Sequence, residues 1–204
     1  MTLMTDIDEV LCRTVEAVLA AIMRRWKLPP NALRLSDVTE WNMHRSLARK
    51  LAGWGVDSLQ AKQHIEALWA DMDFYAGLEP YPIVCRELRE THLATGYELH
   101  FITARPPAAH AVTVAWLKRC LGYDVEVVGA RLHMGFSGPE RLAKVLDVAP
   151  DTYTDDDAAM CRAVYEANPD IVCSIPVRPW NKPQKPAAPM SAVVYSGGAI
   201  LPRH

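Results

Sequence analysis

The sequence predicts an α/β fold in which a mostly parallel β-sheet has helices on both faces and a helical insertion follows the first strand. Two observations support this prediction. Apolar segments of strand length alternate with segments whose apolar residues recur every three or four positions, which is typical of parallel strands joined by helices. The interval from residue 13 to residue 80 has only helical patterns, and it is much longer than a crossover between parallel strands requires.

Five segments have the length and composition of strands, and the first of them ends at an aspartate. In chain order they are residues 2–5, 97–103, 125–128, 152–154 and 171–175. The spacing of apolar residues predicts helices at 15–26, 65–72 and 107–121. We therefore expect a core domain formed by residues 1–12 and 81–178, with a helical insertion at 13–80 between its two parts.

The C-terminal segment differs from the rest of the chain. Six of the 15 prolines fall within residues 176–204. Proline lacks a backbone donor, so this stretch cannot form a regular helix or a central strand. We expect residues 179–204 to be a tail that is extended or partly disordered.

Composition excludes several classes of protein. The chain has 204 residues and a formal net charge of −2 without a block of Lys or Arg, which argues against a nucleic-acid polymer as partner. Its five cysteines are odd in number and include no CxxC pair, so buried free thiols in a reducing compartment are expected. With no leader-like N-terminus and no long apolar run, the sequence predicts a cytoplasmic protein that does not bind membranes. The oligomeric state is left open, with a homodimer as one option.

Two carboxylates follow the first predicted strand. Asp6 and Asp8 flank one residue at its carboxyl end, the edge where α/β sheets bind ligands. Two acidic groups this close stay ionised only beside a positive charge, and a hard divalent cation would supply it. The pattern alone is also that of an ordinary surface turn.

The strand at 97–103 ends in Thr103, and Arg105 follows two residues later. A hydroxyl and free backbone N–H groups at a strand end suit a phosphate oxygen. Threonine at such a place is also a common helix N-cap.

Three aspartates, Asp155, Asp156 and Asp157, follow the strand at 152–154. They could add a ligand to the same cation, form a solvated acidic turn, or cap a helix that begins near residue 158. Lys144 lies in the helical segment before them and, taken alone, is most simply a surface lysine.

Taken together, this order of Asp-x-Asp, Thr, Lys and Asp-Asp, over roughly residues 1–175, resembles the four motifs of the haloacid dehalogenase-like hydrolase superfamily. The resemblance implies a HAD-like Rossmannoid parallel sheet and a helical cap of the C1 type. The paired aromatics before LEPYP, the segment ITARP, and RPWN at 178–181 are similar to C-type 5′(3′)-deoxyribonucleotidases, including phage and bacterial members. One departure is Glu9, where that family usually has glycine; it adds negative charge near an anionic substrate.

The resemblance implies roles for individual residues. Asp6 would be the nucleophile and Asp8 the general acid and base, while Thr103 would donate to a phosphate oxygen. Lys144 would place a positive charge opposite a Mg²⁺ ion, with Arg141 as the fallback. The Mg²⁺ ligands implied are Asp6, the backbone carbonyl of Asp8, and Asp155, with Asp156 open because the register of the aspartates is uncertain.

Substrate contacts are implied less sharply. Arg105 is assigned to substrate binding. Trp41, Phe74 and Tyr75 are expected to stack on a nucleobase, with Trp69 as another candidate that is more simply read as core packing of the insertion's helices.

The expected activity is therefore a Mg²⁺-dependent hydrolysis of (deoxy)nucleoside monophosphates through an aspartyl-phosphate. A phosphatase acting on a sugar phosphate or another small phosphoester is the alternative. A non-catalytic phosphate-binding module would more typically lack Asp6 or Asp8, and dehalogenase chemistry fits the acidic cluster less well.

Overall fold

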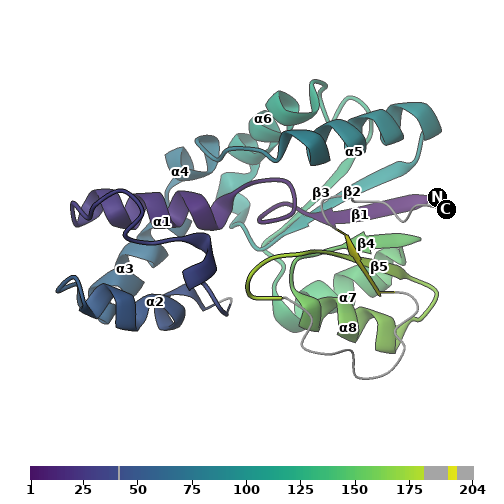
Figure 1. The fold of residues 1–204 in the computed structure, drawn as a ribbon. Helices are drawn as coiled ribbons and strands as arrows, with labels where there is room; N and C mark the ends of the chain where they lie inside the picture. Colours follow the sequence, from purple (N-terminus) through teal and green to yellow (C-terminus); the bar gives the residue numbers. More distant parts are fainter. Residues whose placement is uncertain (41, 182–192, 197–204) are drawn as a thin grey trace.

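The computed structural model describes residues 1–40, 42–181 and 193–196, and its sheet has six parallel strands in the order β3-β2-β1-β4-β5-β6 (Figure 1). The strands are β1 (Thr2–Asp6), β2 (Glu98–Thr103), β3 (Arg131–Met134), β4 (Thr152–Thr154), β5 (Val172–Pro176) and β6 (Val193–Ser196). Because the order reverses at β1, the ends of β1, β2 and β4 meet in the middle of one edge, the place where α/β sheets bind ligands.

The helices lie on both faces of this sheet and beyond its carboxyl edge (Figure 1). They are α1 (Thr14–Arg25), η1 (Leu35–Asp37), α2 (Met43–Ala52), α3 (Ser58–Trp69), α4 (Met72–Ala76), α5 (Pro82–Thr95), η2 (Pro107–Ala109), α6 (His110–Leu121), α7 (Gly138–Val148) and α8 (Ala158–Ala167). Helices α5 and α6 cover one face, and α7 and α8 cover the other.

Alternation along β1 shows how the short first strand is buried on both sides. Leu3 packs into the apolar cluster with α5 and α6, and its neighbour Met4 packs into the cluster with α7 and α8. Successive side chains of a strand point to opposite faces, so a central parallel strand is apolar at both positions. Burial on both faces fixes β1, and hence Asp6 at its end.

Helices α1, α2 and α3 form a separate apolar cluster, which we call the helical unit (residues 14–69). The described residues between 13 and 80 include no strand, as the sequence predicts. Helix α4 contacts α6, and Tyr75 and Leu78 belong to the cluster with α5 and α6 rather than to the helical unit. The division of the chain into domains at 13 and 80 stays a prediction.

One predicted strand is wrong. Residues 125–128 form a turn, and the next strand is Arg131–Met134. The Asp124 side chain accepts a hydrogen bond from the backbone N–H of Glu126 (3.2 Å), and the Asp124 carbonyl accepts one from Val128. This local hydrogen bonding competes with strand pairing, and Val127 is left exposed.

The other predicted strands lie where they were expected, and β6 is an edge strand within the proline-rich tail. The prediction for the rest of the tail falls on residues 182–192 and 197–204, which lie outside the described residues. Within the described part of the chain, no helix combines the length and the apolar character needed to cross a bilayer.

Candidate active site

The site begins at the carboxyl end of β1. Asp6 is the last residue of that strand, pairs with Ile102 across the sheet and is 4% exposed. Its Oδ1 accepts a hydrogen bond from the backbone N–H of Ile7 (2.8 Å), and its Oδ2 accepts one from Arg141 Nη1. The paired strands therefore hold this carboxylate at the sheet edge in a fixed orientation.

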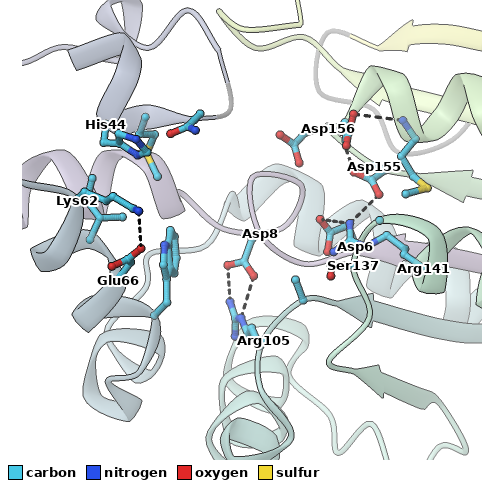
Figure 2. Close-up of a pocket in the computed structure, with 18 residues that line it drawn as sticks. Asp6, Asp8, His44, Lys62, Glu66, Arg105, Ser137, Arg141, Asp155 and Asp156 are labelled. Carbon is cyan, nitrogen blue, oxygen red and sulfur yellow. Dashed lines mark hydrogen bonds and ion pairs between the residues drawn. The ribbon is translucent and has the colours of Figure 1, made fainter. Parts of the chain in front are cut away.

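Three carboxylates converge at this edge (Figure 2). One oxygen each of Asp6, Asp155 and Asp156 lies within 4.8 Å of the others, and all three residues are buried. Burial raises the pKa of Asp6 and of Asp156, and the neighbouring carboxylates raise both further. An acidic cluster of this kind is a candidate site for a hard cation.

The three aspartates after β4 have separate places. Asp157 is the N-cap of α8, and its side chain accepts from the backbone N–H groups of Ala159 and Met160. Asp155 and Asp156 lie in the cluster with Asp6. The helix-cap reading is thus confirmed for Asp157, while a role of Asp155 and Asp156 as cation ligands stays a prediction.

The cation beside the cluster is Arg141, the fallback of the sequence prediction. Its Nη1 lies 3.2 Å from Asp6 Oδ2 and 2.9 Å from Asp155 Oδ2. Lys144 does not lie at the site: its ammonium pairs with Asp147 at 2.8 Å, and it does not line the cavity. Lys144 lies three residues after Arg141, which places it about 4.5 Å further along the axis of α7 and away from the sheet edge.

Asp8 is held by Arg105 (Figure 2). Arg105 donates from Nε to Oδ2 (3.0 Å) and from Nη2 to Oδ1 (2.9 Å), and Thr14 donates to Oδ1 at 2.7 Å. Burial works to raise the pKa of Asp8, but the Arg105 charge and these hydrogen bonds outweigh it, so the pKa is lowered. The structure therefore favours Asp8 as a carboxylate.

Arg105 itself is 2% exposed and lies over the rings of Tyr75 and Trp116, with its guanidinium carbon 4.8 Å and 5.7 Å from their centroids. Arg105 lines the cavity, but Asp8 takes its two charged hydrogen bonds, so its assignment to substrate binding stays a prediction. Thr103 is also buried, and its hydroxyl donates to Asp8 at 3.3 Å.

A cavity of about 690 Å³ opens between these residues and the helical unit. The core side of its wall includes Asp6, Asp8, Ala104, Arg105, Ser137, Gly138, Arg141, Asp155, Asp156, Asp157 and Met160. The helical unit contributes Asn42, Met43, His44, Lys62, Ile65, Glu66 and Trp69. This volume suits a small organic ligand.

The aromatic contacts expected in this wall are mostly elsewhere. Tyr75 is buried under Arg105, with its hydroxyl donating to the Trp69 carbonyl, and Phe74 does not line the cavity. Trp41 lies outside the described residues. Trp69, the candidate first read as core packing, lines the cavity.

Apart from Trp69, sequence reasoning missed the residues of α3 that face the cavity. Lys62, Ile65, Glu66 and Trp69 follow spacings of three, four and seven, so they share one helix face. Lys62 and Glu66 form an ion pair at 3.6 Å (Figure 2). This pattern of charge and aromatic residues at helical spacing was the available signal.

Glu9 does not add charge to the cavity wall, contrary to the expectation from its position. Its backbone has a φ of 59°, the left-handed shape that glycine adopts easily. Its side chain is fully buried; it accepts from the Val15 backbone N–H and the Tyr81 hydroxyl and pairs with Arg178. Burial raises the pKa of Glu9 to about 7.

Comparison with known proteins identifies the fold. No family model and no curated protein matches the sequence. A protein of Burkholderia xenovorans LB400 named as a haloacid dehalogenase-like hydrolase has a TM-score of 0.53 and 19% identity, over 97% of this chain and 95% of that one. A protein of Thermotoga maritima named as a beta-phosphoglucomutase has a TM-score of 0.51 and 15% identity, over 96% and 94%. A dehalogenase has a TM-score of 0.53 and 13% identity, over 96% and 92%.

The chain therefore has the α/β fold of haloacid dehalogenase-like hydrolases. Identities this low establish the fold and leave the chemistry to be argued from the site. The closer resemblance to deoxyribonucleotidases stays a prediction from the motifs.

Proposed function

We propose that the protein is a metal-dependent phosphatase that hydrolyses (deoxy)nucleoside monophosphates through a covalent intermediate on Asp6. The observation that carries the proposal is the cluster of Asp6, Asp155 and Asp156 with Arg141 at one wall of a cavity. Phosphoryl transfer depends mainly on positioning and on stabilising negative charge, and this arrangement supplies the groups for both.

The donor set fits a magnesium ion. Carboxylate oxygens are the ligands that Mg²⁺ prefers, and Asp6, Asp155 and Asp156 bring theirs within 4.8 Å of one another. Burial raises the pKa of Asp6 and of Asp156, and the neighbouring carboxylates raise both further, so a bound cation would favour the charged form of each. When bound, the cation would offset the charge of the attacking carboxylate and of the phosphoryl group.

In the proposed reaction, Asp6 attacks phosphorus and the ester oxygen leaves with a proton from Asp8. Asp8 then removes a proton from the water that hydrolyses the aspartyl-phosphate. The first role requires a protonated Asp8, whereas Arg105 favours the carboxylate. A phosphate dianion arriving beside Asp8 is a like charge and raises the proton affinity of Asp8.

The start of α7 provides a place for phosphate oxygens. Ser137 and Gly138 line the cavity at the N-terminus of this 11-residue helix, where unpaired backbone N–H groups attract anions. Arg141, one turn later, adds a guanidinium between Asp6 and Asp155. We infer that phosphate binds between this helix end and Asp6.

The far wall of the cavity supports a nucleotide as substrate. Trp69 offers a ring on which a base could stack, and the Lys62–Glu66 pair offers a donor and an acceptor for the base edge. The same polar pair, together with His44, would also suit the hydroxyls of a sugar phosphate, which is the second candidate.

Phosphate release tests the proposal. Nucleoside monophosphates, sugar phosphates and p-nitrophenyl phosphate are compared with Mg²⁺ and with EDTA, using the wild type and Asp6→Asn. We expect Mg²⁺-dependent release that Asp6→Asn abolishes. Arg141→Met should lower kcat by roughly 10²–10³, the usual cost of removing a charge-stabilising donor, whereas Lys144→Met on the same helix should change it less than twofold.

Phosphate release from non-nucleotide esters alone would support the phosphatase activity and reject nucleotides as the substrate class. Release from none of these substrates, in a protein that folds, would contradict the proposed activity.

A further inference from the structure

The turn after β5, residues 178–181, lies between the helical unit and the acidic cluster formed by Asp6, Asp155 and Asp156. Asn181 is 7% exposed and fixes the shape of this turn. Its Nδ2 donates to the carbonyls of Asp156 (2.8 Å) and Pro176 (2.9 Å), and its Oδ1 accepts from the Arg178 backbone N–H (2.7 Å). The Asn181 side chain therefore ties the turn at 178–181 to the backbone of Asp156.

Trp180 contacts both sides of this junction. Its indole Nε1 donates to Asp156 Oδ2 at 2.9 Å, so it holds one oxygen of that carboxylate. Its ring packs against the apolar cluster of the helical unit, which is formed by α1, α2 and α3. The Trp180 side chain thus joins a carboxylate of the acidic cluster to the separate apolar core of the helical unit.

Arg178 contacts both connections between the helical unit and the sheet. Its guanidinium donates to the backbone carbonyl of Glu9, with the Nε bond at 3.0 Å, and lies 3.4 Å from Glu9 Oε2. It also lies over the ring of Tyr81, 4.5 Å from the centroid. Glu9 precedes α1 and Tyr81 precedes α5, so Arg178 ties the outgoing connection to the returning one.

We propose that residues 178–181 position Asp156 for the cation and link that carboxylate to the helical unit, with Trp180 as the positioning residue. This inference rests on the cation site of the proposed function. Trp180 is not a ligand; its indole N–H holds Oδ2 of Asp156, a carboxylate that places an oxygen within 4.8 Å of oxygens of Asp6 and Asp155.

The expected effect follows from how outer hydrogen bonds act on metal sites. A donor that fixes a ligating carboxylate is worth 10- to 100-fold in metal affinity. Loss of the indole N–H would let Asp156 rotate away from Asp6 and Asp155, whose charges repel it. Because the ring also packs on the helical unit, a substitution that keeps the ring separates the hydrogen bond from the packing.

Calorimetric titration of Mg²⁺, without substrate, tests the inference in the full-length protein. We expect Trp180→Phe to weaken Mg²⁺ binding about tenfold while the unfolding midpoint changes little, since the aromatic ring is kept. Trp180→His, which restores an N–H donor, should recover part of the affinity. The control is Trp54→Phe, at a residue that is 47% exposed and absent from the cavity wall, and it should bind Mg²⁺ as the wild type does.

The outcomes separate this inference from the proposed function. Unchanged affinity in a folded Trp180→Phe, with Mg²⁺ binding intact in the wild type, would overturn the inference alone. A wild type that binds no Mg²⁺ would overturn the cation site and the inference together. Should Trp180→Phe fail to fold, the indole N–H signals of the ¹⁵N-labelled wild type are followed during the titration, with Trp180→His to assign residue 180. The Trp180 signal must then shift with Mg²⁺, and its failure to shift would reject the inference.

Discussion

Replacing Arg105 by Met should destabilise the protein strongly, whatever substrate the site binds. The Arg105 side chain is 1% exposed and that of Asp8 is 16% exposed, and two hydrogen bonds join them. Removing one partner of a buried ion pair leaves the other charge uncompensated, at about 3–5 kcal/mol. For a chain of this length that corresponds to a fall of roughly 10 °C in the unfolding midpoint.

The double-mutant cycle makes this reasoning testable. Asp8→Asn strands Arg105 in the same way, so it should also cost about 3–5 kcal/mol. The double variant leaves no unpaired charge and should be more stable than the sum of the singles predicts by at least about 2 kcal/mol. Urea unfolding of the four proteins measures this coupling.

The matched control is the partly exposed pair on α7, where Lys144→Met and Asp147→Asn should each change stability by less than about 0.5 kcal/mol. Additivity of the Arg105 and Asp8 substitutions within about 0.5 kcal/mol would refute the buried-pair argument, as would a loss at Lys144 equal to that at Arg105.

Two further predictions concern Glu9 and the cavity wall. Burial raises the pKa of Glu9 from 4.5 to about 7, so the folded protein holds that proton more tightly than the unfolded chain does. The free energy of unfolding should therefore fall as pH rises from about 4.5 to about 7, by an amount on the order of 3 kcal/mol. Urea unfolding at several pH values measures this dependence, and Glu9→Gln should remove the part of it that Glu9 causes. An unchanged pH dependence in Glu9→Gln would contradict the prediction. Lys62→Gln and Glu66→Gln should each lower kcat/KM for nucleotides about tenfold and leave kcat/KM for p-nitrophenyl phosphate unchanged, because that substrate has no base edge. The control Gln60→Ala lies away from this wall and should change neither value. Equal losses on both substrates would reject a role of Lys62 and Glu66 in recognising the base.

The sequence predicts the sheet well because its signals are local. The strands that end at Asp6, at Thr103 and just before Asp155 are short apolar runs, and the rules for parallel sheets bring their carboxyl ends together. The turn at 125–128 was misread because valines favour strands in general, while the hydrogen bonds of one aspartate decided the local structure.

The charged partners could not be assigned from sequence with the same certainty. Arg141 and Lys144 lie on the same helix three residues apart, and both are long cations. The choice depends on how far each side chain lies from the sheet edge, which is set by where α7 begins and how it packs. Arg105 posed a related problem, because a buried arginine at a strand end can serve a phosphate or a carboxylate, and only the fold shows that Asp8 occupies it.

Glu9 illustrates how a departure from a family pattern can be absorbed by the structure. A glycine at this place would supply a left-handed backbone, and Glu9 adopts that backbone with a φ of 59°. Unlike glycine, Glu9 has a side chain, which points away from the cavity and contacts α1, Tyr81 and Arg178. The Glu9 carboxylate, expected to oppose an anionic substrate, thus pairs with Arg178. Arg178 also ties both connections of the helical unit to the turn beside Asp156. A residue that looks unfavourable for substrate binding is therefore better explained as part of the junction between the cation site and the helices that face it.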